Sequence, residues 1–269
     1  MARLRGDLLS LLVVAGLILA VSFLPPDTTL RQAQETGILR ACVPDSYPPL
    51  VTGDADAPGV DVEVLGEVAG ELGLRLQTVR NSNIGRDFNP RNWRLTRAQC
   101  LVIAGGVVDT VTTRGFLVVT EPHLETGWAA VTLGDPPPTL QGATVGFYAG
   151  LTGLDRLRLG LWLRQRGATV TVVSDRGAAH DGLVSGRFDV LVSEALTARG
   201  IAGEAGGNAV WLPEEAASRV PLGFGLWKGD LTLERAIERA LRTIKRDGRM
   251  EEILTRYELA PIETECGFC

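Results

Sequence analysis

The chain has 269 residues, more than the roughly 100 to 200 residues of a typical single domain, so one large domain or two lobes are expected. Its composition, with 45% hydrophobic and 22% charged residues, is that of a globular protein and excludes long disordered regions. The formal net charge of -5 excludes the basic surface that nucleic-acid binding requires.

Residues 1–26 are predicted to form a membrane anchor or a signal segment. Arg3 and Arg5 precede an apolar run at residues 8–24, which is just long enough to cross the hydrocarbon core. No small-x-small cleavage motif follows, which favours an uncleaved anchor over a cleaved signal peptide, and a buried core helix is the remaining alternative. The two arginines should stay in the cytoplasm, so the rest of the chain is expected at the periplasmic side of the inner membrane.

Residues 27–36 are polar and are expected to form a helical stem. The next part of the chain is expected to contain strands at residues 39–43, 74–79, 100–106 and 127–133 and a helix at residues 62–72. Residues 80–99, before the third of these strands, are polar and irregular. The three prolines at 136–138 can continue neither a strand nor a helix, so they are expected to connect two lobes.

A second α/β unit follows this connector. Its expected strands lie at residues 143–150, 169–174, 188–193 and 209–213, and its helices at residues 154–167, 177–186 and 195–203. Such alternation predicts parallel sheets covered by helices, with ligands bound in the cleft at the carboxyl ends of the strands. One long periodic helix is expected at residues 233–257. The expected boundaries are 37–134 with 218–262 for lobe 1, 135–217 for lobe 2 and 263–269 for a cysteine-containing tail.

Five segments together resemble a known family. They are "GILRACVPDSYPPL", "GVDVEVLGEVAGELGLRLQTV", "LQGATVGFYAGLTG", "LVSGRFDVLVSE" and "GFGLWKGDLTLERAIERALRTIKRDGRMEEILTRY". In this order they resemble the bacterial extracellular solute-binding proteins of family 3, the amino-acid-type periplasmic substrate-binding proteins of ABC transporters. The resemblance implies a two-lobe α/β periplasmic-binding-protein-like fold of type II with a hinge. It also implies a small ligand, an amino acid or related organic acid, and an ABC permease as the membrane partner.

The resemblance also implies residues for the ligand's charged groups. Arg114 is the nearest match to the arginine that holds a carboxylate, with Thr110 at the preceding threonine position. The spacing between them is four residues instead of the family's three, and a surface arginine is the alternative. Glu194 stands where the family places an acid for the ammonium group, and a helix-cap role is its alternative.

Two further positions are implied on the cleft walls. Tyr47 should form an aromatic wall at the end of the first strand, stiffened by the two prolines after it, or else pack against the following helix. Thr152 matches a threonine at a helix start, where backbone N–H groups receive an anion, and it could instead only cap that helix.

An even number of cysteines suits an oxidising compartment. Cys42 and Cys100 lie on strands that should be neighbours, so they could form a disulfide, with buried free thiols as the alternative. Cys266 and Cys269 form a C-x-x-C motif without a second ligand pair, which indicates a local disulfide or reactive thiols instead of a zinc site. No metal and no cofactor are expected.

The sequence contains no nucleophile elbow, phosphate loop or metal cluster, so a binding protein is expected instead of an enzyme. A periplasmic cyclohexadienyl dehydratase-like enzyme is one alternative, for which Glu194 or His123 would be the proton-transfer group. An accessory or sensory module that docks on a membrane or periplasmic partner is another. Its sequence support is the anchor together with an arginine-rich loop containing Arg86, Arg91, Arg94 and Arg97.

Overall fold

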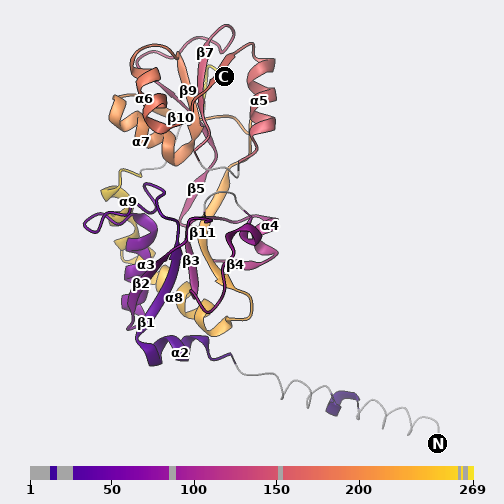
Figure 1. Cartoon of the computed structure of the whole chain (residues 1–269), viewed down its shortest axis with the longest axis vertical. Coiled ribbons are helices and arrows are strands. Elements are labelled where there is room, and N and C mark those ends of the chain that lie inside the picture. Colours follow the sequence, from indigo (N-terminus) through magenta and orange to yellow (C-terminus); the bar gives the residue numbers. More distant parts are fainter. Residues whose placement is uncertain (1–12, 17–26, 85–88, 151–153, 260–261, 263–265) are drawn as a thin grey trace, which may run out of the picture.

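The computed structural model describes residues 13–16, 27–84, 89–150, 154–259, 262 and 266–269. It contains two lobes stacked along the long axis of the molecule (Figure 1). The expected two-lobe α/β fold is therefore confirmed. Most of the expected anchor lies outside the described residues, and no described helix is long and apolar enough to cross a membrane.

Lobe 1 is built on a sheet with the strand order β2-β1-β3-β11-β4, with β5 also paired to β11. Its strands are β1 (Ile38–Val43), β2 (Arg75–Arg80), β3 (Val102–Val108), β4 (Leu117–Val119), β5 (Leu124–Thr126) and β11 (Val220–Trp227). Its helices are α2 (Thr29–Thr36), α3 (Val60–Glu71), the 3-10 helix η1 (Pro90–Trp93), α4 (Val111–Arg114), α8 (Leu231–Arg246) and α9 (Arg249–Arg256).

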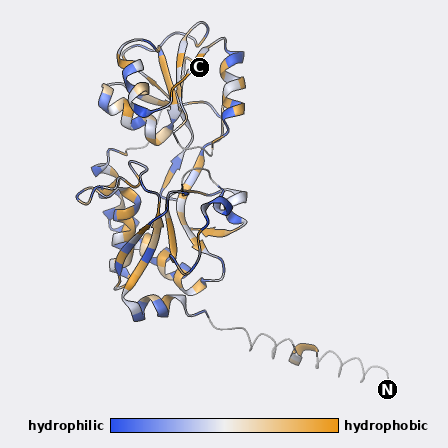
Figure 2. Ribbon diagram, viewed as in Figure 1, coloured by the Kyte–Doolittle hydropathy of each residue, from blue (hydrophilic) through white to orange (hydrophobic). Residues whose placement is uncertain are grey.

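Every residue of β3 is buried because both faces of the sheet are covered. One face packs under α3 and α8, while Ile103 and Val107 on the other face join a cluster that contains the fully buried Trp93. The apolar strands at the centre and the polar outer faces of the helices are visible in Figure 2. Trp93 thus fastens residues 89–99 to the sheet.

Lobe 2 is built on a sheet with the order β10-β6-β9-β7-β8. Its strands are β6 (Trp128–Thr132), β7 (Thr144–Tyr148), β8 (Thr169–Val172), β9 (Val190–Glu194) and β10 (Asn208–Trp211), and its helices are α5 (Arg156–Gln165), α6 (Arg176–Val184) and α7 (Ala195–Ala205). The expectation of parallel sheets was wrong in part. Strands β7, β8 and β9 are parallel, but β6 runs antiparallel to both its neighbours, and β11 is antiparallel to its partners in lobe 1.

The antiparallel strands are those that carry the chain between the lobes. In the hinge, Thr126 of β5 pairs with Val220 of β11, and β6 begins in lobe 2 only two residues after Thr126. The expected boundary at residue 134 was therefore wrong, because residues 128–132 already belong to lobe 2. The apolar pattern of β6 could not reveal which sheet it joins, and the prolines at 136–138 lie in the irregular segment after it.

The last predicted helix is divided in two. Gly248 has a φ of 90°, a conformation that ends α8 and starts α9. The expected stem is helical as α2 and lies against lobe 1, where Asp27 accepts a 2.6 Å hydrogen bond from the Thr232 backbone N–H.

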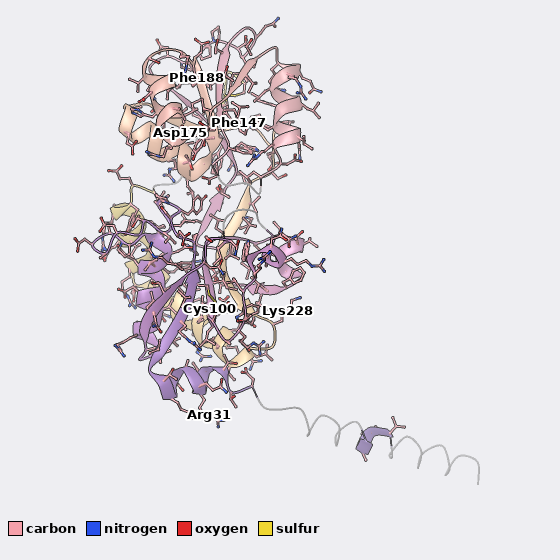
Figure 3. All side chains as sticks on the ribbon, viewed as in Figure 1. Arg31, Cys100, Phe147, Asp175, Phe188 and Lys228 are labelled. Carbon is pink, nitrogen blue, oxygen red and sulfur yellow. A yellow bond between two sulfur atoms is a disulfide. The ribbon has the colours of Figure 1, made fainter. Side chains whose placement is uncertain are left out.

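Two disulfides are present. Cys42 and Cys100 are bonded, with Cα atoms 5.5 Å apart, and they link β1 to the start of β3 in lobe 1, where Figure 3 labels Cys100. Cys266 and Cys269 are bonded to each other in the tail. The tail lies on lobe 2, where the Cys266 N–H donates to the Trp211 carbonyl at 2.8 Å. The chain thus ends on the lobe opposite to the one that holds its last helix.

Candidate functional site

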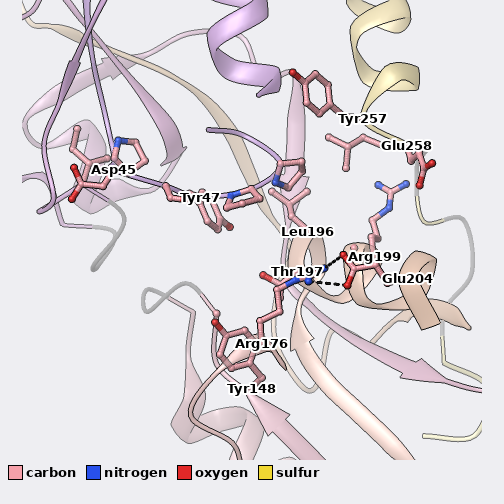
Figure 4. Close-up of a pocket in the computed structure, with 18 of the residues that line it drawn as sticks. Asp45, Tyr47, Tyr148, Arg176, Leu196, Thr197, Arg199, Glu204, Tyr257 and Glu258 are labelled. Atoms are coloured by element: carbon pink, nitrogen blue, oxygen red, sulfur yellow. Dashed lines mark hydrogen bonds and ion pairs between the residues drawn. The ribbon is translucent and has the colours of Figure 1, made fainter. Parts of the chain in front are cut away.

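A cleft of about 570 Å³ lies between the lobes and is lined from both sides (Figure 4). Lobe 1 contributes mainly the loop after β1 and the residues after α9, and lobe 2 contributes α7 and the end of β7. The lining residues with polar side chains are Asp45, Ser46, Tyr47, Ser82, Tyr148, Arg176, Thr197, Arg199, Glu204, Tyr257 and Glu258. All 3 tyrosines of the chain are among them.

Tyr47 is held on the cleft wall by a tight turn. Its N–H donates to the Val51 carbonyl at 2.6 Å, and its carbonyl accepts from the Val51 N–H at 2.9 Å. The residue is only 9% exposed. Burial, followed by the negative charge of Glu194, raises the pKa of Tyr47 well above its usual value. The hydroxyl is therefore protonated and lies near the carboxylate of Glu194.

A buried pair of ionisable groups lies behind this loop. Asp61 at the start of α3 accepts hydrogen bonds from the Gly105 N–H at 2.7 Å and from His123 Nε2 at 2.8 Å. A Cβ at Gly105, whose φ is 85°, would come within 2.2 Å of Pro44 Cδ, so glycine is required for β3 to meet the loop. His123 stacks on Phe224 and does not line the cleft.

Glu194 is fully buried at the junction of β9 and α7. Its carboxylate caps α7 by accepting from the backbone N–H groups of Leu196 at 3.1 Å and Thr197 at 3.0 Å. It also accepts from the hydroxyl groups of Thr197 and of Thr126 in the hinge strand β5. The two carboxylate oxygens thus accept four hydrogen bonds from the protein itself. Its binding to a ligand's ammonium group stays a prediction.

One face of α7 forms the wall of lobe 2. Leu196, Gly200 and Glu204 recur every four residues and all line the cleft. Glu204 is held by Arg176 of α6 in a two-pronged ion pair at 2.7 and 2.8 Å, which lowers the pKa of Glu204. Figure 4 shows this pair beside Thr197.

Arg199 lies on the same helix but, unlike Arg176, does not form an ion pair with a described acid. It is half-buried, which lowers the pKa of its guanidinium group, and it has no acidic partner among the described residues. Its side chain points toward Glu258 of lobe 1 (Figure 4). Sequence reasoning missed Arg199 because nothing in its neighbourhood marks it as different from a surface arginine.

The other predicted ligand residues lie elsewhere. Arg114 is 67% exposed on α4, and its guanidinium group donates to Asp109 at 2.5 and 2.6 Å, which lowers the pKa of Asp109. Thr110 caps α4 by accepting from the Thr113 N–H at 3.2 Å. Neither residue lines the cleft. Thr152 lies outside the described residues, so its role, like that of the other two, stays a prediction.

The structure also shows the contacts of two arginines of the arginine-rich loop and tests for a metal site. The guanidinium carbon of Arg91 lies 4.9 Å from the centroid of the Phe116 ring. The guanidinium group of Arg97 forms an ion pair with the carboxylate of the buried Asp230 at 3.1 Å. Arg86 lies outside the described residues. Within the described part of the chain, no group of three or more histidine, cysteine or acidic residues could hold a metal ion.

The sequence profile of the bacterial extracellular solute-binding proteins, family 3, matches residues 39–260. The chain belongs to this family. No curated protein sequence matches it.

Solved structures with the same two-lobe fold include three whose titles describe binding proteins or receptors for solutes. The L-cystine solute receptor of Neisseria gonorrhoeae in its unliganded open conformation has a TM-score of 0.67 at 18% identity, over 88% of this chain and 100% of the receptor. An ABC uptake transporter substrate-binding protein from Streptococcus pneumoniae with bound histidine has a TM-score of 0.60 at 17% identity, over 89% and 99%. An ancestral amino-acid-binding protein, a precursor of cyclohexadienyl dehydratase, has a TM-score of 0.58 at 18% identity, over 85% and 98%.

Proposed function

We propose that this solute-binding protein captures an amino acid or a related organic acid in the cleft between its lobes and delivers it for uptake through an ABC permease. The proposal rests chiefly on the cleft itself, to which both lobes contribute and which all three tyrosines of the chain line. Tyrosine combines a rigid apolar ring with a polar tip, so it covers a small ligand at little cost in conformational entropy.

The hinge supports capture by closure. The described lobes are joined where β5 pairs with β11 and where β6 leaves β5, so few backbone torsions separate the two sheets. Hinges that close two lobes around a ligand are commonly a few residues at the ends of such elements. The similar structures named above as an L-cystine receptor and as a histidine-bound protein favour an amino acid as the ligand class.

Membrane tethering is part of the proposal and rests on the sequence of residues 1–26. An apolar run behind two arginines and without a cleavage motif favours retention at the periplasmic side of the inner membrane. Fractionation of cells that express the full chain tests this part. Recovery in the membrane fraction at full length is expected, and a shortened protein in the soluble periplasm would contradict it.

Calorimetric titration of the purified full chain with the twenty L-amino acids tests the main proposal. We expect at least one to bind with a stoichiometry of one. Tyr47→Ala should weaken that binding by about 10- to 100-fold, because it removes a buried aromatic wall. Phe116→Ala, which truncates a ring outside the cleft, is the matched control and should leave the affinity unchanged. Failure of every amino acid and of their organic-acid analogues to bind would contradict the proposal.

The dehydratase alternative has less support from the geometry. Such an enzyme needs an acid or base that reaches the ligand, yet His123 is engaged with Asp61 behind the cleft wall and Glu194 accepts four hydrogen bonds from the protein. Turnover of prephenate or arogenate by the purified chain would establish it.

A further inference from the structure

The C-terminal tail starts on lobe 1. Tyr257, directly after α9, is held there because its hydroxyl donates to Glu63 of α3 at 2.6 Å and accepts from the Gly59 N–H at 2.8 Å. Leu259 is only 4% exposed, and its N–H donates to a carbonyl of α9 at 2.9 Å. Both residues line the cleft, so the tail leaves lobe 1 at the edge of the cleft.

The same tail is bound to lobe 2 three residues later. Trp211, which is buried at the end of β10, donates from its indole Nε1 to the Ile262 carbonyl at 2.8 Å. The Trp211 carbonyl accepts from the Cys266 N–H, also at 2.8 Å. Ile262 packs against the hydrophobic cluster of lobe 2 that contains Trp211. Because β10 is the edge strand of its sheet, its outer side can receive the tail.

The end of the tail is attached to lobe 2 a second time. Arg166, directly after α5, donates from Nε to the Cys269 carbonyl, and its guanidinium carbon lies 3.9 Å from the centroid of the Trp162 ring. Phe268 and both cysteines of the tail pack against the hydrophobic core. The disulfide between Cys266 and Cys269 closes this end of the chain into one loop. The tail is therefore held on lobe 2 both at β10 and at α5.

We propose that the tail is a third connection between the lobes and that it limits how far the cleft opens on the side of α9. Among the described residues, the other two connections run from β5 to β6 and from β10 to β11. Figure 1 shows α9 in lobe 1 and the C-terminus in lobe 2. Three peptide units join Leu259 to Ile262, so their Cα atoms are at most about 11 Å apart. A wider opening on this side would have to pull Ile262 away from Trp211.

Glu258 shows that the lobes are close to each other beside this connection. Its φ of 56° lies in the left-handed region that non-glycine residues seldom adopt. One of its carboxylate oxygens lies 3.6 Å from the position of a Cβ atom built on Gly203 of α7. A side chain that follows the last helix of lobe 1 thus reaches the helix that forms the wall of lobe 2.

This connection changes what the hinge allows. Two adjacent segments leave two lobes free to rotate about them, whereas a third segment attached at both ends restricts that rotation. A cleft that is already restrained loses less conformational freedom when it closes on a ligand. The inference goes beyond the proposed function, because the restraint acts on the empty protein and does not depend on which ligand is bound.

Distance measurements on the ligand-free full chain test the inference. Nitroxide labels are attached through p-acetylphenylalanine at Val184 of α6 and Glu252 of α9, so the native disulfides stay intact. Both positions are exposed, and both helices lie on the same side of the molecule (Figure 1). Six glycine and serine residues inserted between residues 260 and 261 lengthen the connection by up to about 20 Å and keep every attachment. Pulsed electron–electron resonance should then show a mean distance longer by about 5 Å or more.

The same insertion after Asp56, in an exposed loop of lobe 1 outside the cleft, is the matched control and should leave the distance unchanged. A chain that ends at Leu259 lacks the connection and should show the same shift or a larger one. If this chain does not fold, the lengthened variant, which keeps every attachment, decides alone.

Three results would overturn the inference. The first is a wild-type distance in the lengthened variant, and the second is an equal shift in the control insertion. The third is a shift in the lengthened variant but not in the chain that ends at Leu259, because the insertion itself would then push the lobes apart. No ligand is used, so failure of every amino acid to bind would contradict the proposed function and leave this result unaffected.

Discussion

The two lobes place a buried carboxylate behind the cleft in the same way but build the cleft wall from different side chains. In lobe 1, Asp61 fixes the loop region through the Gly105 N–H and His123. In lobe 2, Glu194 fixes the start of α7 and reaches Thr126 of the hinge. In front of these acids, lobe 1 presents rings and prolines, whereas lobe 2 presents a helix with charged side chains.

This difference separates the carboxylates that hold the structure together from the side chains that line the cleft. A carboxylate whose oxygens accept hydrogen bonds from backbone N–H groups holds the cleft wall in place. Those hydrogen bonds largely compensate its charge. Arg199, by contrast, lines the cleft and has no acidic partner among the described residues. Position at a strand end thus does not by itself make an acid a ligand-binding residue.

The lobes also differ in their covalent bracing, and removal of the disulfides should show the largest effects. The bond between Cys42 and Cys100 closes a loop with a sequence separation of 58 residues inside lobe 1, whereas the bond between Cys266 and Cys269 spans only 3. Loop-closure entropy predicts that Cys42→Ala with Cys100→Ala lowers the free energy of unfolding by about 4 kcal/mol, and the tail pair by about 1.5 kcal/mol. Urea unfolding of both double variants measures this, and equal losses would contradict it.

Removal of the capping carboxylate should destabilise lobe 2 next most. Glu194→Ala leaves buried backbone and hydroxyl donors at the start of α7 without an acceptor, so we expect the free energy of unfolding to fall by about 3 kcal/mol. Glu204→Ala removes a carboxylate from the same helix in an exposed ion pair and should cost less than about 1 kcal/mol. If the two variants lost the same stability, Glu194 would not be the structural acid described here.

Part of this comparison could be predicted from the sequence. The apolar run followed by prolines around Tyr47 is a local pattern, and local patterns predict where a strand ends. The pairing of Cys42 with Cys100 follows once the first and third strands are neighbours. The order in which the family's motifs occur predicted the two-lobe fold. The two sheets and the family match over residues 39–260 confirm it.

The rest depends on tertiary contacts. Arg199 resembles any helical arginine until α7 is seen to face the cleft, and β6 resembles a strand of either lobe until its partners are known. The distance from Thr110 points to Arg114, but Arg114 ends the short helix α4, and Asp109, two residues before that helix, binds its guanidinium group. Competition from a neighbouring acid of this kind leaves no periodic signal.

A smaller effect is expected from alkaline pH and concerns lobe 1. The Tyr257 hydroxyl donates to Glu63 at 2.6 Å and accepts from the Gly59 N–H at 2.8 Å, and burial, followed by Glu63, raises the pKa of Tyr257 to about 12. An unfolded tyrosine ionises near pH 10, so between about pH 10 and 12 the unfolded chain binds fewer protons and the free energy of unfolding falls as pH rises. Urea unfolding across this range should show a shallower fall for Tyr257→Phe, and an unchanged slope would contradict this assignment.

Hydrogen exchange of the full chain, followed by mass spectrometry with and without a saturating mixture of the twenty L-amino acids, tests most directly whether both lobes grip one ligand. The amides that should slow together are those of residues 44–51 in lobe 1 and residues 195–204 in lobe 2, because closure buries both walls of the cleft. Slowing in only one of these segments, or in neither, would contradict capture between the lobes.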